Sequence, residues 1–171
     1  MKDVEALGLE PISWLVAHRL VTEFPEWANY FSATEDRRLR IAVPTEHAVI
    51  TAPLVVEVDA DGVVSVTWHS NRGEPAWSYD WIVESLVWPE PSDWGHDSTA
   101  LDGMADWLSD FVAEDLVAVT LFARRKWIGA APAPIDGITP RLGIHADEAI
   151  LRSWRGTYDR ALRKSKDGLW T

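Results

Sequence analysis

The chain has 171 residues, a formal net charge of −11 at pH 7, 11 tryptophans and no cysteine. Without cysteine it forms no disulfide, thiolate zinc site or iron–sulfur cluster, and it has no cysteine nucleophile. Its negative charge argues against nonspecific nucleic-acid binding, because the phosphate backbone would repel it. The length predicts a single domain over 1–171, with 141–171 as a candidate for a loosely attached C-terminal element.

The charge is unevenly distributed along the chain. Residues 1–123 carry 6 Lys/Arg against 22 Asp/Glu, whereas residues 124–171 carry 10 against 5. Regions of opposite sign either attract each other within the fold or form separate surfaces. The N-terminus lacks a basic segment followed by an apolar one, and no apolar run approaches the length of a membrane span. We therefore expect a cytoplasmic protein with no signal peptide and no membrane partner.

The first third of the chain predicts a helix followed by short strands. Apolar residues recur at helical spacing after Pro11, which predicts an amphipathic helix over 11–23 that ends before Pro25. A second short helix is expected to begin at Pro25. Residues 39–43 alternate and are followed by a proline, which favours a strand.

Two alternating runs predict a β-hairpin. Leu54–Val58 and Val63–Trp68 each place apolar residues on one face, and Gly62 in the connection can adopt the positive φ of a tight turn. The next run, 76–88, fits both a strand and a helix by spacing. Its β-branched and aromatic residues favour a strand.

A helix over about 99–114 has the clearest pattern in the chain, with a continuous apolar stripe and a contrasting acidic face. Strands are expected over 116–122 and 127–131, joined by a basic turn at 124–126. Residues 146–162 have helical spacing, with a strand through 153–157 as the alternative. These elements predict an α+β fold: a mainly antiparallel sheet, the 99–114 helix on one face, and N-terminal and C-terminal helices.

From Leu54 to Ala131 the chain is similar to small, acidic, cytosolic bacterial proteins of the immunity type. The resemblance covers about half of the chain and consists of the element order, the tryptophan content and the acidity. Proteins of that type neutralise a cognate toxin by binding it. The resemblance implies a non-enzymatic protein and assigns no site residue.

The acidic helix face and two tryptophans are the predicted binding residues. Carboxylates four residues apart repel one another on a helix, so they indicate either a solvated face or a docking surface for a basic protein. Trp88 and Trp94 lie in a loop segment rich in proline and glycine, which favours an exposed interface anchor over a core position for at least one of them. The acidic residues are Asp102, Asp106, Asp110 and Glu114.

An enzyme or small-ligand binder with a tryptophan-lined pocket is the alternative interpretation. His96 lies between two aspartates, and folding could bring His69 beside it, which would pair a general base with a carboxylate. The catalytic candidates of this alternative are His69, His96, Asp93 and Asp97. No motif for a metal or cofactor is present, and we expect neither. A third interpretation is an assembly component, for example from a phage, that acts as a homo-oligomer.

Overall fold

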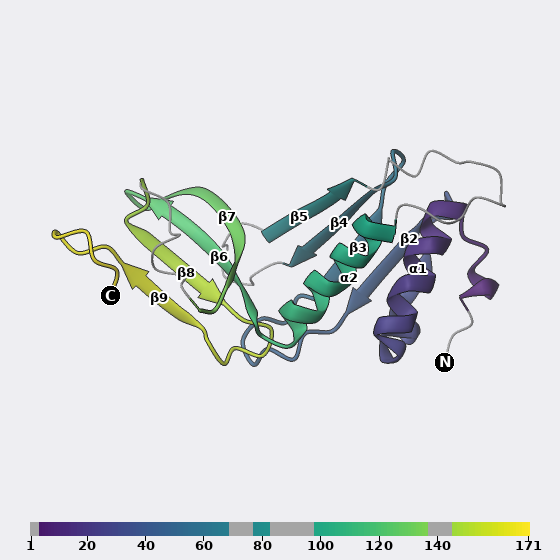
Figure 1. Cartoon of the computed structure of the whole chain (residues 1–171), viewed down its shortest axis with the longest axis horizontal. Coiled ribbons are helices and arrows are strands. Elements are labelled where there is room, and N and C mark those ends of the chain that lie inside the picture. Colours follow the sequence, from purple (N-terminus) through teal and green to yellow (C-terminus); the bar gives the residue numbers. More distant parts are fainter. Residues whose placement is uncertain (1–3, 69–76, 83–97, 137–144) are drawn as a thin grey trace. The chain divides into compact units, whose positions relative to one another are not determined.

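The computed structural model describes residues 4–68, 77–82, 98–136 and 145–171, and it contains two antiparallel sheets with helices (Figure 1). The α+β prediction is confirmed. Contacts divide the chain into two compact units. Unit 1 comprises Met1–Val43, Pro53–Thr67 and Tyr79–Ser109, and unit 2 comprises Pro44–Ala52, Trp68–Ser78 and Asp110–Thr171.

The five-stranded sheet is a simple meander in the order β1-β2-β3-β4-β5. The predicted hairpin is confirmed as β3 and β4, and Gly62 in its turn has a φ of 79°. The strand interpretation of 76–88 holds for its described part, which is β5. The strands are β1 (Phe31–Ala33), β2 (Leu39–Val43), β3 (Leu54–Val58), β4 (Val63–Trp68) and β5 (Trp77–Ile82).

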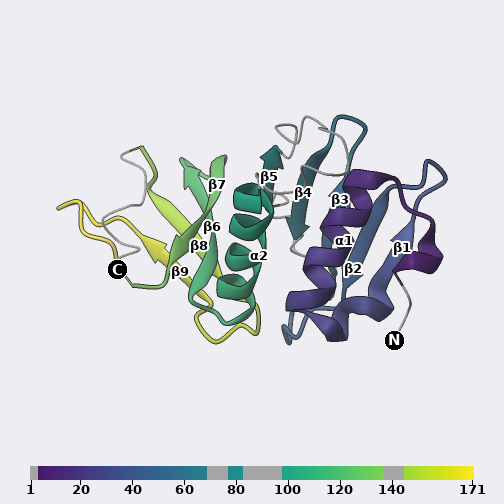
Figure 2. The same ribbon diagram turned by 45° about the vertical axis from the view of Figure 1, so that its right-hand side comes forward.

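One face of this sheet is buried. In β2, β3 and β4 every second side chain is buried, as in the pair Ile41 and Val56, which lie opposite each other. Helix α1 (Pro11–Glu23) and helix α2 (Ser98–Val112) both lie in front of the sheet (Figure 2). Short 3₁₀ helices η1 (Glu5–Leu7) and η2 (Pro25–Tyr30) flank α1. The predicted helices over 11–23 and about 99–114 are therefore confirmed, the second with a shorter C-terminal end.

Two polar contacts of α1 fix its place in unit 1. The buried hydroxyl of Ser13 donates to Glu10 Oε1 at 3.0 Å and accepts the N–H of Leu39 at 3.0 Å. On the same helix, Arg19 Nε donates to Asp102 Oδ1 of α2 at 2.9 Å. This hydrogen bond and a second one to Glu23 raise the pKa of Arg19 above its ordinary value, because both carboxylates favour the charged guanidinium.

The four-stranded sheet belongs to unit 2 and has the order β7-β6-β8-β9. Its strands are β6 (Leu116–Ala123), β7 (Lys126–Pro134), β8 (Glu148–Arg152) and β9 (Arg160–Arg163). Alternate residues of β6 and β8 form the apolar cluster of one face, with Leu162 from β9. The sheet confirms the two strands predicted on either side of the basic turn.

The C-terminal helix expected over 146–162 is wrong. Residues 148–152 form β8, which pairs with β6 and buries Ala149 and Leu151 on one face. Apolar residues in this segment satisfy a period of two as well as a helical period, and pairing with β6 decides between them. The alternative interpretation, a strand through 153–157, is also wrong, because these residues form a turn in which Gly156 has a φ of 85°.

The last residues continue the sheet of unit 2. Arg163 and Thr171 exchange two backbone hydrogen bonds of 2.9 and 3.0 Å, so the C-terminal residues fold back beside the end of β9. Trp170 packs against the apolar cluster. In the described parts of the chain, no helix is long and apolar enough to cross a membrane.

Replacing Ser13 tests the contact between α1 and the sheet. Ser13→Ala leaves the buried N–H of Leu39 without its acceptor, which we expect to cost about 1–3 kcal/mol of unfolding free energy. Urea unfolding measures the loss. Ser32→Ala is the matched control, because its hydroxyl bonds the carbonyl of Arg40 at an exposed position. Equal losses in the two variants would contradict the assignment.

Candidate functional site

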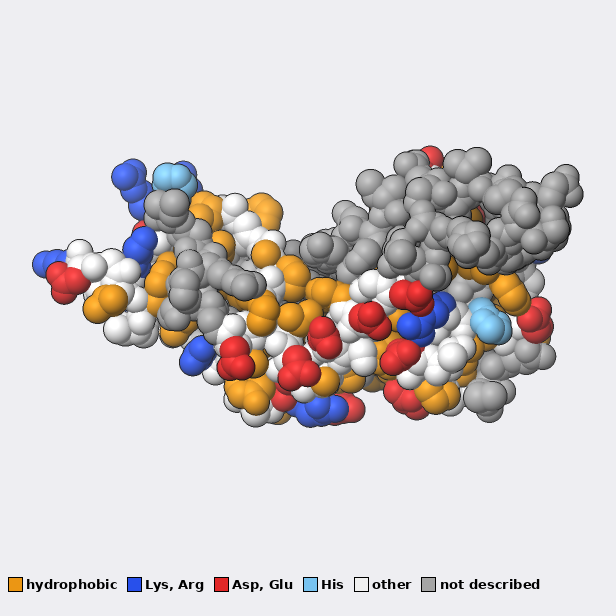
Figure 3. Space-filling model, in the orientation of Figure 1, with side chains coloured by type: hydrophobic (Ala, Val, Ile, Leu, Met, Phe, Trp, Pro, Cys, Tyr) orange, Lys and Arg blue, Asp and Glu red, His pale blue; other side chains and the backbone are white. Residues whose placement is uncertain are grey.

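The acidic face of α2 contains fewer free carboxylates than the sequence suggests. Asp102 forms an ion pair with Arg19 at 2.9 Å. Asp106 and Asp110 are exposed, and no hydrogen bond or ion pair joins their side chains to another described residue. Figure 3 shows acidic side chains in a row along α2. Two of the four predicted carboxylates therefore face solvent without a described partner.

Glu114 is not part of that face. Helix α2 ends at Val112, and Glu114 follows it in the left-handed conformation, with a φ of 67°. Its side chain is buried and accepts the N–H of Arg155 at 2.7 Å. Glu114 therefore does not share the exposed acidic face of α2 that the sequence predicts, because its carboxylate is an acceptor for the turn at 153–157.

The surroundings of Glu114 favour the ionised carboxylate. Burial by itself would raise the pKa of Glu114, but hydrogen bonds from Thr157, Ser153 and the N–H of Arg155 outweigh it. The net effect lowers the pKa below its ordinary value of 4.5. The guanidinium of Arg155 extends the same network, since it bonds Glu46 Oε2 at 2.7 Å and the carbonyl of Val112 at 3.0 Å.

The predicted tryptophan anchors and catalytic candidates lie outside the described residues. They are Trp88, Trp94, His69, His96, Asp93 and Asp97. The structure therefore neither brings these side chains together nor separates them. Both interpretations that depend on them stay predictions.

Sequence reasoning missed a buried histidine in unit 2. The side chain of His47 is 4% exposed, and its Nε2 lies 2.8 Å from Asp159 Oδ2. The carboxylate of Asp159 also accepts hydrogen bonds from the guanidinium of Arg152 at 3.3 Å and from the N–H of Ser153 at 2.9 Å. His47 and Asp159 are 112 residues apart in the sequence, so no local pattern could have paired them.

The hydrogen bonds of His47 indicate which of its ring nitrogens carries the proton. The N–H groups of Val49 and Ile50 donate to Nδ1 at 3.0 and 2.9 Å, so Nδ1 carries the lone pair. Nε2 then carries the proton, and its N–H donates a hydrogen bond to Asp159. Both ring nitrogens are occupied in this arrangement. The pair therefore holds the segment 44–52 against the 153–159 turn and is not placed to accept a proton from a substrate.

Three aromatic side chains complete the surroundings of His47. Trp68, Phe111 and Trp154 are buried, and their ring centroids lie between 5.4 and 6.1 Å apart. His47 contacts the edge of this group through Trp68, at 6.0 Å. Edge-to-face contacts of this kind stabilise beyond the area that they bury. The hydrogen bond between His47 and Asp159 thus lies beside a buried aromatic group, which indicates a structural role.

The turn between β6 and β7 has an unusual backbone. Arg124 and Arg125 are its two central residues, with φ values of 51° and 63°. Two-residue hairpin turns of this kind favour Asn-Gly, because side-chain-bearing residues other than Asn and Asp resist positive φ. Each such residue costs on the order of 1–3 kcal/mol. The N–H of Arg124 donates to Asp147 Oδ2 at 2.7 Å, which helps to hold the turn.

A β-bulge follows the turn. Phe122 pairs with Trp127 and Leu121 pairs with Gly129, which leaves Ile128 as the extra residue of β7. Trp127 is 52% exposed and Ile128 is 46% exposed. Bulges commonly redirect side chains at sheet edges. Here two neighbouring large apolar side chains reach solvent beside three cations, Arg124, Arg125 and Lys126.

Comparison with protein-family models, with curated proteins and with solved structures found no match to this chain. Within 4–68, 77–82, 98–136 and 145–171, no group of three or more His, Asp or Glu side chains is arranged to hold a metal ion.

Substitution of Gly156 tests the contact between His47 and the 153–159 turn. A Cβ at Gly156 would lie 3.0 Å from His47 Nε2, whereas the nearest atom at Gly168 is 4.0 Å away. The two glycines have φ values of 85° and 82°, so alanine carries the same backbone cost at both. We expect Gly156→Ala to lose about 1–3 kcal/mol more than Gly168→Ala in urea unfolding. Similar losses would mean that His47 does not hold the turn.

Glu114→Gln tests the buried carboxylate. Because the folded pKa is lowered, the carboxylate stabilises the fold above the ordinary pKa of 4.5 and loses this effect as the pH falls through the folded value. We expect the variant to be about 1–3 kcal/mol less stable at neutral pH. The difference from the unmodified chain should narrow in acid. Asp115→Asn, at the exposed neighbour, should show neither effect.

Proposed function

We propose that this chain is a non-enzymatic protein-binding module of the inhibitor or immunity type, which docks a basic partner through α2. The observation that carries the proposal is the exposure of Asp106 and Asp110. Asp102 is engaged with Arg19, and Glu114 is buried. Internal pairing therefore accounts for two of the four carboxylates and leaves the central two open to a partner.

The charge of unit 1 supports a basic partner. This unit holds 5 Lys/Arg against 17 Asp/Glu, whereas unit 2 holds 11 against 10. An excess of one sign attracts a partner of the opposite sign over long distances and accelerates encounter. Asp106 and Asp110 lie one helical turn apart, about 6 Å along the axis. A partner with two cations at a similar spacing would contact both.

The buried histidine supports a binding role over catalysis. The nitrogens of His47 are committed to Val49, Ile50 and Asp159, so this histidine is not available as a general base for a substrate. The other interpretation, with His69 and His96, has no described geometry behind it. A toxin would be the basic partner if the resemblance to immunity-type proteins reflects function.

The double variant Asp106→Asn with Asp110→Asn tests this proposal. We expect slower association with a basic helical peptide rich in lysine and arginine, by several-fold at low salt, because steering depends on charge. Stopped-flow or surface plasmon resonance measures the rate. The difference should shrink in high salt, where charges are screened.

Glu35→Gln with Asp36→Asn is the matched control. It removes the same total charge from the chain, at two exposed positions in a turn far from α2 in sequence. If both double variants slow association equally, net charge alone explains the effect and α2 is not the docking site. If only the α2 variant slows association, the partner class can be identified by capture from the source cell. The unmodified chain should then capture basic proteins that the α2 variant does not.

A further inference from the structure

We propose that the hairpin end, Arg124–Ile128, is a second docking site, which takes an acidic and partly apolar segment of a partner protein. This site lies in unit 2 and does not depend on α2. It joins exposed apolar side chains to cations on one short stretch of backbone.

The apolar part consists of Trp127 and Ile128. Both are about half exposed, although they follow each other in a strand, where neighbours normally point to opposite faces. The bulge at Ile128 removes that alternation. Tryptophan is enriched among the residues that dominate binding energy at protein interfaces. Trp127 is therefore the expected anchor.

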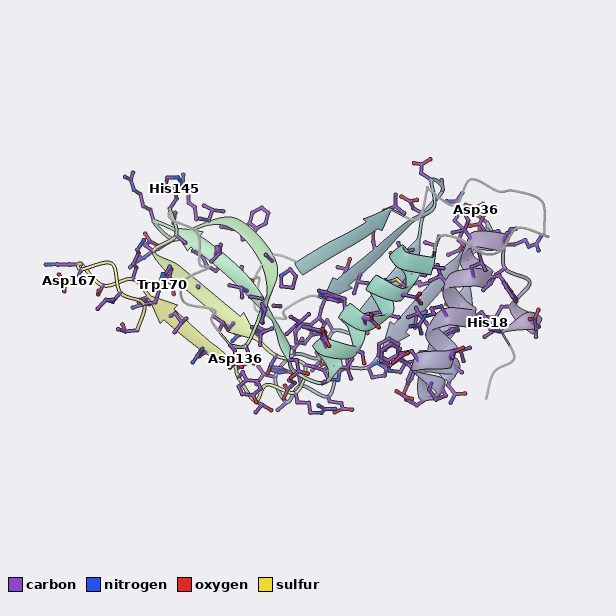
Figure 4. The ribbon with its side chains drawn as sticks, viewed as in Figure 1. His18, Asp36, Asp136, His145, Asp167 and Trp170 are labelled. Carbon is purple, nitrogen blue, oxygen red and sulfur yellow. The ribbon has the colours of Figure 1, made fainter. Side chains whose placement is uncertain are left out.

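The charged part consists of Arg124, Arg125 and Lys126, all exposed. His145 lies at the same end of the sheet (Figure 4), and basic side chains gather beside a histidine there (Figure 3). Two carboxylates neighbour the cations: Asp147, which is exposed and offsets part of the positive charge, and Glu148. Asp147 accepts the N–H of Arg124, and Glu148 pairs with Arg163 at 3.6 Å. The three cations are thus complementary to carboxylates that a partner would supply.

A partner would bind the side chains of this site and would not extend the sheet. β7 is an edge strand, but it carries three features that prevent strand addition: a lysine at its start, the bulge at Ile128, and prolines at 132 and 134. The edge is therefore protected while Trp127 and Ile128 stay exposed. Protection of the backbone together with exposure of the apolar side chains indicates recognition by side chains.

A protein segment fits this site better than a polyanion. The whole chain has a net charge of −11, and unit 2 as a whole is close to neutral. Nucleic acid and anionic membranes present dense negative charge, which this chain would repel. A peptide with a few carboxylates around an apolar residue meets the local cations and the tryptophan with much less repulsion.

The turn keeps two arginines where Asn-Gly would be more favourable. Their positive φ values make the hairpin end locally strained. Strained backbone persists at positions where the side chains have a use. Charge at the turn explains the choice of residues, because Asn-Gly would supply none.

Panning a displayed library of random peptides on the full chain tests the proposal without knowledge of the partner. We expect the selected peptides to be enriched in Asp and Glu around an aromatic or aliphatic residue. Recovery of peptides without acidic enrichment, or of no peptides above background, would overturn it.

Two variants locate the binding of a selected peptide. Trp127→Ala should weaken it by about tenfold or more, whereas Leu169→Ala, at a side chain that is 67% exposed in the same unit, should not. Arg124→Asn with Arg125→Gly should weaken binding and also raise the thermal midpoint, since it relaxes the turn. A loss of binding in a more stable chain cannot come from unfolding.

Two further measurements separate this site from a general basic patch. Arg160→Gln with Lys166→Gln removes the same charge at other exposed positions of unit 2 and should leave peptide binding unchanged. Phosphatidylserine vesicles and single-stranded DNA should bind more weakly than the peptide. Stronger binding of either one that Trp127→Ala does not reduce would overturn the proposal in favour of a lipid or nucleic-acid surface.

Discussion

Unit 2 depends on two carboxylates that accept backbone N–H groups of the 153–159 turn, where no strand or helix pairs them. Asp159 accepts the N–H of Ser153, and Glu114 accepts the N–H of Arg155. These N–H groups would otherwise lie unpaired near a buried tryptophan, Trp154, which is costly. The same Asp159 also meets His47. One turn thereby connects the ends of α2, of β8 and of the 44–52 segment within the unit.

The sequence predicts the elements whose signals are local. The helix over 11–23, the hairpin at Leu54–Trp68 and the helix after Ser98 follow from apolar periodicity and turn residues. The C-terminal segment defeats this reasoning, because Ala149 and Leu151 satisfy two periods and only pairing with β6 selects the strand. Where periodicity is ambiguous, a neighbour distant in sequence determines the structure.

The candidate site shows the same limit. Acidity along α2 predicts exposed carboxylates correctly at Asp106 and Asp110, but Glu114, which follows at the same spacing, is buried. Glu114 itself adopts the left-handed conformation after the end of the helix. Its carboxylate is buried where it accepts the N–H of Arg155, which is about 40 residues away in the sequence. The hairpin end was recognised as basic, yet the bulge that exposes Ile128 leaves no trace in composition or spacing. Charge can be read along a helix, whereas exposure depends on tertiary contacts.

The division of the chain has a consequence for how the protein can be handled. Each unit is assembled from three separate stretches that alternate along the sequence. No single cut can release either unit as a continuous fragment, because the stretches of the two units alternate along the sequence. Half-length fragments are therefore poor reagents for assigning activities to one unit. Point substitutions in the intact chain are the appropriate way to separate them.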